Sequence, residues 1–292
     1  MTKNRILAAV LILFCIAEIA YGFMKPQTKK LVTGNQTIEL VHNPWDTEIS
    51  SISVVALVLE EAGYKVKLTA VDNAVLYKSL ASGEADATTS AWLPSTHGEI
   101  MEAYKEDLVD LGPNMKGTQN GMVVPAYSDI NSIEDLKDQV GQKIIGIEPG
   151  AGIMLQSETA MKEYSNLKDW KLESPSTGAM LGALQSAIDN NKDVVVIGWK
   201  PHWKFERFDL KFLEDPKNIF GGEEYIHTLT RKGFGEEYPE ANQILDNFEW
   251  TPEDMQSITL QMEEGVDPKK AAQDWIDAHR DQVDQWLDIE KS

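Results

Sequence analysis

Short apolar segments alternate with amphipathic segments from residue 37 onward, a pattern that predicts an α/β fold. The strands expected in this first part lie at residues 37–41, 66–70 and 85–91, and the helices at 49–62 and 74–81. The first helix carries its apolar residues on one face and is expected to stop at Gly63. The first part of the chain is therefore expected to form one α/β lobe.

A second α/β pattern begins near residue 121. Residues 121–127 form an apolar segment in which Pro125 indicates an edge strand or a crossing between lobes. Ser132 and Asp135 resemble a capping box that opens a helix to Val140. The later elements expected here are strands at 143–147 and 194–198, a helix at 153–164, and a helix capped by Ser176 or Thr177.

The C-terminal part of the chain is helical in pattern. After a return crossing over residues 226–230, helices are expected at 239–248, 251–264 and 268–287. Two α/β lobes joined by two crossings, with a helical end returning to the first, form a bilobed ligand trap. We predict that residues 37–124 and 231–292 form lobe 1 and that residues 125–230 form lobe 2.

The first 22 residues have the pattern of an export segment. Lys3 and Arg5 precede an apolar run, and small residues stand at Ala20 and Gly22, as in a secretory signal cleaved before Phe23. Residues 23–36 are expected to be a linker. An uncleaved membrane anchor is an alternative, because the apolar stretch is nearly long enough to span a bilayer.

A lipid anchor on Cys15 is the third alternative, although Phe14 stands where such signals usually place a small residue. All three alternatives predict a protein body outside the cytoplasm, in the periplasm or on the outer face of the cell membrane.

Charge and composition exclude several classes of protein. The 27 Lys and Arg residues against 47 Asp and Glu residues give a net charge of −20, which argues against a nucleic-acid partner. Cys15 is the one cysteine in the sequence, so neither a disulfide framework nor a thiolate metal site is expected. The HExxH and GxSxG motifs are absent from the sequence. We therefore predict no enzyme, no cofactor and no metal.

Three tryptophans follow predicted strands closely. Trp45, Trp92 and Trp199 come just after the strands at 37–41, 85–91 and 194–198. In open α/β sheets, ligands bind beyond the carboxyl ends of the strands. Indole rings are the best side-chain receptors for cations, and several rings together suit a quaternary ammonium group. The tryptophans at 170, 250, 275 and 286 are expected to be core residues.

A glycine-rich turn after the strand at 143–147 adds an anion site. The turn at residues 150–153 (GAGI) opens a helix, so free backbone N–H groups and the positive helix end can face an anion there, and the two glycines allow a ligand to approach the backbone closely. A tight strand–helix turn is the plainer interpretation of the turn alone. A cation box opposite a carboxylate site is the arrangement expected for a zwitterion such as a betaine.

His97, five residues after Trp92, is a candidate hydrogen-bond donor to the ligand carboxylate or a simple loop histidine. His202 and Trp203 follow Trp199 and are left without a role.

Three segments carry a resemblance to a known family. Residues 90–97 (SAWLPSTH), 146–154 (GIEPGAGIM) and 198–205 (GWKPHWKF) resemble extracytoplasmic substrate-binding proteins of glycine betaine/proline betaine ABC transporters. Further similarity lies at 213–217 and 230–234, and the whole resemblance runs from about Thr37 to Trp286. The resemblance implies a bilobed, periplasmic-binding-protein-like (type II) fold that closes around the ligand.

The resemblance also implies the roles of individual residues. Trp45, Trp92 and Trp199 would hold the ammonium group, while the amides of Gly152 and Ile153, assisted by His97, would hold the carboxylate. The ligand would be glycine betaine, taken up as an osmoprotectant, and the partners the membrane permease and ATPase subunits of an ABC transporter. The protein is expected to be a monomer. Many family members are lipoproteins with a lipobox, which this chain lacks.

Other functions stay open at this point. A receptor for choline or carnitine would use the same tryptophans, but choline has no carboxylate for the glycine turn. An exported enzyme on the same fold or a sensor ectodomain are alternatives of other classes.

Overall fold

The computed structural model describes residues 36–289. The predicted signal or anchor at 1–22, and all of the linker at 23–36 except its last residue, lie outside the described residues. Within 36–289, no helix is long and apolar enough to cross a membrane.

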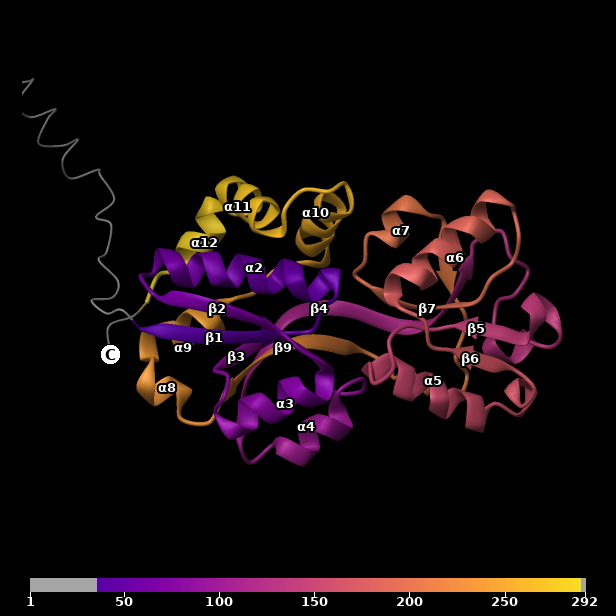
Figure 1. Ribbon diagram of the computed structural model, residues 1–292, viewed down its shortest axis with the longest axis horizontal. Coiled ribbons are helices and arrows are strands. Elements are labelled where there is room, and N and C mark those ends of the chain that lie inside the picture. Colours follow the sequence, from indigo (N-terminus) through magenta and orange to yellow (C-terminus); the bar gives the residue numbers. More distant parts are fainter. Residues whose placement is uncertain (1–35, 290–292) are drawn as a thin grey trace, which may run out of the picture. The chain divides into compact units, whose positions relative to one another are not determined.

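A mixed sheet of nine strands runs through both halves of the described chain (Figure 1). The strands are β1 (Thr37–His42), β2 (Lys65–Ala70), β3 (Ala87–Leu93), β4 (Leu108–Pro125), β5 (Lys143–Ile145), β6 (Lys171–Glu173), β7 (Val196–Lys200), β8 (Leu210–Phe212) and β9 (Glu224–Arg231). Their order is β2-β1-β3-β9-β4-β7-β5-β6, with β8 paired to β4. The α/β class predicted from the alternating pattern is confirmed.

Helices cover the sheet in both halves. They are α2 (Asp46–Glu61), α3 (Asn73–Ser82), α4 (Gly98–Tyr104), α5 (Gly152–Glu163), α6 (Thr177–Asp189), α7 (Lys204–Arg207), α8 (Phe234–Glu237), α9 (Pro239–Asn247), α10 (Pro252–Glu263), α11 (Pro268–Ala278) and α12 (Arg280–Trp286). Helices α10 and α11 lie beside α2, and α12 packs against α9 and α11, so the C-terminal helices return to the first half as predicted (Figure 1).

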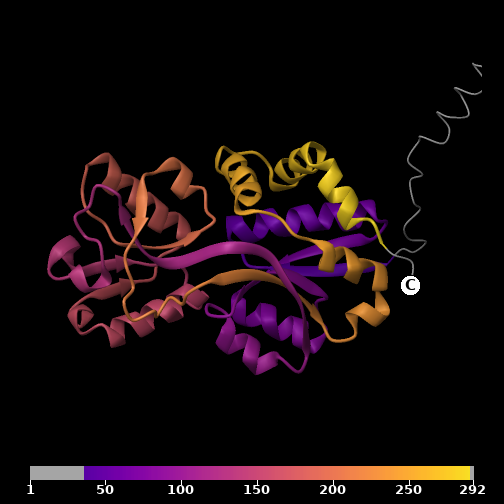
Figure 2. The same ribbon diagram turned by 180° about the vertical axis from the view of Figure 1, so that it is seen from behind.

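The two halves are joined by β4 and by the chain leading into β9 (Figure 2). Residues 108–118 of β4 pair with β9, whereas residues 119–123 pair with β7, so the strand changes partner between Thr118 and Gln119. All of β9 pairs with β3 and β4 of the first half. We call the halves on either side of this change the first and second lobes; the lobe boundaries at 124 and 230 stay a prediction.

The β4–β9 pairing is irregular. Its register shifts between Asp110 and Gly112, between Pro113 and Met115, and between Met115 and Thr118. β4 also begins at Leu108 rather than Gly121, where the sequence predicts its start. Gly112, Pro113 and Gly117 break the alternation of apolar residues that marks a regular strand.

Two predicted helices are wrong in length. Ser132 and Asp135 form the predicted capping box, but the helix is a single 3₁₀ turn, Ile133–Asp135, and Val140 has a φ of 54° that no α-helix contains. The helix predicted over 268–287 is broken at His279, whose φ of −120° lies outside the helical range. Sequence periodicity continues across such a break because both helices bury the same side.

The tryptophans expected in the core are buried there. Trp250, Trp275 and Trp286 form one aromatic cluster beneath the C-terminal helices, with ring centroids 5.8–5.9 Å apart. Trp170 is buried in the second lobe and donates its Nε1–H to the Lys137 carbonyl at 2.8 Å. None of these four rings lines the pocket described next.

Candidate ligand-binding site

A pocket lies between the lobes and brings all six predicted site residues together. The space left between its side chains, including the opening to solvent, is about 330 Å³. It is lined by Trp45, Thr47, Glu48, Trp92, Thr96, His97, Asn120, Ile147, Ala151, Gly152, Ile153 and Trp199.

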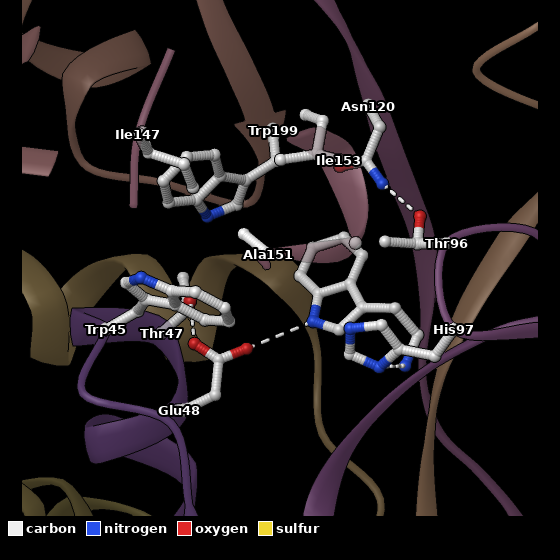
Figure 3. A pocket seen from close by; sticks show the side chains of 12 residues that line it. Trp45, Thr47, Glu48, Thr96, His97, Asn120, Ile147, Ala151, Ile153 and Trp199 are labelled. Carbon is white, nitrogen blue, oxygen red and sulfur yellow. Dashed lines mark hydrogen bonds between the residues drawn. The ribbon is translucent and has the colours of Figure 1, made fainter. Parts of the chain in front are cut away.

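The three predicted indoles reach the pocket from the carboxyl ends of strands, although Trp92 and Trp199 lie within β3 and β7 and not just after them, because both strands end two residues later than predicted. Trp45 is the N-cap residue of α2, just after β1; Trp92 lies near the end of β3; and Trp199 lies near the end of β7. Figure 3 shows Trp45 and Trp199, from different lobes, on opposite sides of one space. Leu93–Pro94 and Lys200–Pro201, which follow Trp92 and Trp199, are both cis peptides.

Three indole N–H groups at or near the pocket donate to carboxylates. Trp92 Nε1 donates to Glu48 Oε1 at 3.0 Å within the first lobe. Trp45 Nε1 donates to Glu148 Oε2 of the second lobe at 3.2 Å. Trp203, which the sequence left without a role, donates its Nε1–H to Asp46 Oδ2 at 3.2 Å. The last two bonds join the lobes across the pocket.

Gly152 and Ile153 are the first two residues of α5. The N-cap residue Ala151 provides no side-chain cap, and within residues 36–289 the N–H groups of Gly152 and Ile153 have no hydrogen-bond acceptor. Free N–H groups and the positive end of the helix dipole favour an anion at this position.

Gly152 is also a point of contact between the lobes. A Cβ atom built on Gly152 would lie 2.5 Å from Thr96 Cγ2 and 2.6 Å from Thr96 O, both in the loop after β3. The same atom would lie 2.9 Å from His97 Cδ2. The close approach therefore requires a glycine at this position.

His97 is buried at the pocket wall and is neutral. Its Nδ1 accepts the backbone N–H of Trp92 at 3.1 Å, so the ring proton resides on Nε2. Burial lowers the pKa of His97 to about 3. The ring also packs edge-on against Tyr77, with centroids 5.8 Å apart. The Nε2–H group is consequently the one donor that the imidazole can offer.

Glu48 lines the pocket and was not identified from the sequence. Its side chain points from α2 into the pocket, and the residue is only 3% exposed (Figure 3). Burial raises the pKa of Glu48 to about 7, although the Thr47 hydroxyl and the Trp92 indole both donate to it. An acid in the first turn of a helix is common, so its position in the sequence gives no sign of this burial.

A second buried acid fixes the loop that carries Thr96 and His97. Glu224, the first residue of β9, accepts hydrogen bonds from Thr96 N at 2.6 Å, Thr96 Oγ1 at 2.8 Å and Asn120 Nδ2 at 2.9 Å. Asn120 belongs to the part of β4 that pairs with the second lobe. The network therefore connects the pocket wall to the place where the chain crosses between lobes.

Behind Trp199 the second lobe buries a lysine and a histidine. Lys204 Nζ lies 4.0 Å from the centroid of the Trp199 ring, and burial holds the pKa of Lys204 well below its usual value. His202 packs edge-on against Trp199, with centroids 4.9 Å apart, and its Nδ1 accepts the Lys204 N–H. These contacts support the Trp199 ring from outside the pocket.

The described residues contain no group of three or more His, Cys, Asp or Glu side chains arranged to hold a metal ion.

Comparison with known proteins identifies relatives of the same fold. Residues 36–278 match the model of the substrate-binding domain of ABC-type glycine betaine transport systems. The glycine betaine/carnitine transport binding protein GbuC of Listeria monocytogenes is 49% identical over 160 residues. That match spans 54% of this chain and 53% of the relative, so the chain spans about half the length of this curated relative.

Solved structures agree over most of the chain. Lactococcal OpuAC, in a closed conformation with glycine betaine, has a TM-score of 0.85 and 47% identity, covering 87% of this chain and all of the other. The glycine betaine/L-proline-binding protein ProX of Borrelia burgdorferi has a TM-score of 0.83 and 34% identity, covering 86% and 96%. Since the family model matches well over half of the residues, the chain belongs to the family of substrate-binding domains of ABC-type glycine betaine transport systems.

Proposed function

We propose that this protein binds glycine betaine outside the cytoplasm and delivers it to an ABC transporter for osmoprotectant uptake. The observation that carries the proposal is the pocket itself, in which indoles from both lobes face one space beside two free backbone N–H groups. Family membership, and the names of the relatives described above, support the same ligand.

The ammonium group of the ligand occupies the space between Trp45, Trp92 and Trp199. A quaternary ammonium has no proton to donate, so it gains little from a hydrogen-bond acceptor and much from aromatic faces. Each ring contributes roughly 0.5 to 2 kcal/mol by cation–π attraction when solvent is excluded. Trp92 and Trp199 are 5% and 6% exposed, which provides that exclusion.

The carboxylate of the ligand lies at the start of α5. The N–H groups of Gly152 and Ile153 donate to it, and the neutral His97 ring donates from Nε2. Residues of both lobes then hold one ligand, and binding stabilises the arrangement in which the lobes meet.

The partners in this proposal are the permease and ATPase subunits of the transporter, and the protein acts as a monomer and not as an enzyme. A location outside the cytoplasm agrees with the export pattern of residues 1–22 and with the relatives that are named as periplasmic binding proteins.

Titration calorimetry with glycine betaine, proline betaine, carnitine and choline tests the proposal. We expect glycine betaine to bind and choline, which lacks a carboxylate, to bind more weakly. Choline competing equally with glycine betaine would contradict the carboxylate site.

Trp92→Ala should weaken glycine betaine binding at least tenfold, about 1.4 kcal/mol, because it removes one face of the cation site. Trp170→Phe is the matched control, since Trp170 is buried outside the pocket and its replacement should leave affinity unchanged. Equal affinities of the Trp92→Ala variant and the unsubstituted protein for glycine betaine would contradict the proposal that tryptophans hold the ammonium group.

A further inference from the structure

Glu48 is a buried carboxylate in the wall of the pocket. Oε1 accepts a hydrogen bond from Trp92 Nε1 at 3.0 Å and Oε2 accepts one from Thr47 Oγ1 at 2.6 Å, and the backbone N–H of Glu48 also donates to the carboxylate. All of these donors are neutral groups, so the ionised carboxylate is hydrogen-bonded but has no positive charge beside it.

The described residues supply no cation for this carboxylate. Glu48 forms no ion pair among residues 36–289, and the one charged side chain that acts on it is Asp46, which carries the same sign. The buried Lys204 lies against the Trp199 ring and donates to the Trp199 carbonyl at 3.5 Å instead. A buried charge without a counter-ion is costly, and proteins rarely keep one.

We infer that the missing counter-ion is the ligand, and that Glu48 is the residue that selects a positively charged head group over a neutral one of the same shape. The inference rests on the proposed function and adds a residue to it. The Glu48 carboxylate lies beside the proposed ammonium site. It accepts the indole N–H of Trp92, and it lines the same pocket as Trp45 and Trp199.

Glu48 acts on the cation in two ways. Its charge attracts the ammonium group directly, and the burial of Glu48 limits the screening of this attraction by water. Its hydrogen bond to Trp92 Nε1 also fixes the orientation of that ring.

The test compares glycine betaine with 3,3-dimethylbutanoate, in which carbon replaces the nitrogen and removes the positive charge. Both ligands carry the same carboxylate, so the contribution of α5 and His97 cancels in the ratio of their affinities. In Glu48→Gln, which keeps the size and an acceptor oxygen, we expect the preference for glycine betaine to fall at least tenfold, about 1.4 kcal/mol.

Glu148→Gln is the matched control. Glu148 also accepts an indole N–H, that of Trp45, at 3.2 Å. It does not line the pocket, however, and it accepts a further hydrogen bond from the backbone N–H of Thr177. This variant should change the affinities for the two ligands together and keep their ratio. A ratio unchanged in Glu48→Gln, or lowered equally in Glu148→Gln, would overturn the inference.

Failure of the proposed function gives a different result. If the unsubstituted protein binds neither ligand, both proposals fall; if it binds glycine betaine tightly while Glu48→Gln keeps the full preference, only the role of Glu48 falls. Thermal unfolding shows whether each variant is folded.

Protonation removes the same charge without a substitution. In the unsubstituted protein, the preference for glycine betaine should fall as the pH is lowered from about 8 to about 6, through the raised pKa of Glu48, near 7. The neighbouring titratable groups are Asp46 on α2, His97 in the loop after β3, and Glu148, His202 and Lys204 from the second lobe.

Burial holds the pKa values of His97 and His202 below this range, and hydrogen bonds from Thr177 help to hold that of Glu148 below its usual value. The pKa of Lys204 is lowered toward the range by burial, so Lys204→Met is measured alongside. A preference that does not vary with pH in either protein would contradict the role of Glu48.

Discussion

Gly152 makes two contributions at one position, since its N–H faces the pocket and its missing side chain leaves room for the loop of the other lobe. The lack of a side chain restricts the choice of residue more strongly than the N–H does. Thr96 O is a backbone atom and cannot move aside as a side chain could.

Gly152→Ala should therefore weaken glycine betaine binding at least tenfold, about 1.4 kcal/mol, while each lobe stays folded. The added Cβ meets Thr96 only when the lobes are together, so the substitution acts on closure and not on the unfolding of a lobe. Titration calorimetry measures the loss and thermal unfolding shows the folding of the variant.

Gly178→Ala is the control for this substitution. Gly178 lies in the first turn of α6 as Gly152 lies in that of α5, but a Cβ there has no neighbour within 4 Å. Its affinity should not change. A Gly152→Ala variant that binds as tightly as this control would show that the lobes need not approach as closely as described.

The residues of the site differ in how far the sequence reveals them. The three tryptophans stand out because each lies at or just past the end of an apolar segment, and a glycine-rich turn before a helix has a known geometry. Glu48 does not stand out, since it is one of 47 acidic residues and nothing in the sequence distinguishes a buried glutamate from an exposed one. Only the fold shows which acid is enclosed.

The start of helix α2 is another feature that the sequence pattern does not reveal. The pattern of apolar residues predicts a start at residue 49, whereas the helix begins at Asp46. The first turn of α2 is polar because it faces the pocket. The spacing of apolar residues, from which the helix is predicted, therefore gives no sign of this turn. The residues hidden in this way, Thr47 and Glu48, both line the pocket.

The first turn of α2 also provides a contact between the lobes. Asp46 accepts the indole N–H of Trp203, which precedes α7 in the second lobe. Trp203→Phe removes this hydrogen bond and keeps an aromatic ring, so it should weaken glycine betaine binding by a few-fold, on the order of 1 kcal/mol.

A double-mutant cycle with Asp46→Ala checks this expectation by titration calorimetry. If the bond acts in closure, the second substitution should cost little once the first is present. Fully additive losses would show that the two residues act separately.

At the scale of the whole molecule, the bilobed fold follows from the order of the elements, but the change of lobe does not. The sequence marks Pro125 as an edge strand or a crossing, and β4 changes its pairing partner between Thr118 and Gln119. Strand pairing over this distance depends on residues more than a hundred positions away in β9, and a local pattern carries no information about them.

Ligand binding should make the molecule more compact, because each lobe supplies only part of the site. Small-angle X-ray scattering is expected to show a smaller radius of gyration when glycine betaine is added to the unsubstituted protein. The Gly152→Ala variant should stay extended at the same ligand concentration. An identical change in both proteins would mean that the lobes close without the Gly152–Thr96 approach.

The irregular register of β4 against β9 has a mechanical consequence. A regular ladder resists bending, because every backbone hydrogen bond along it must lengthen at once. The β4–β9 ladder is interrupted three times between Asp110 and Thr118, so a bend at these interruptions does not have to stretch every hydrogen bond of the pairing. The interrupted part of the sheet lies next to the place where β4 passes from one lobe to the other.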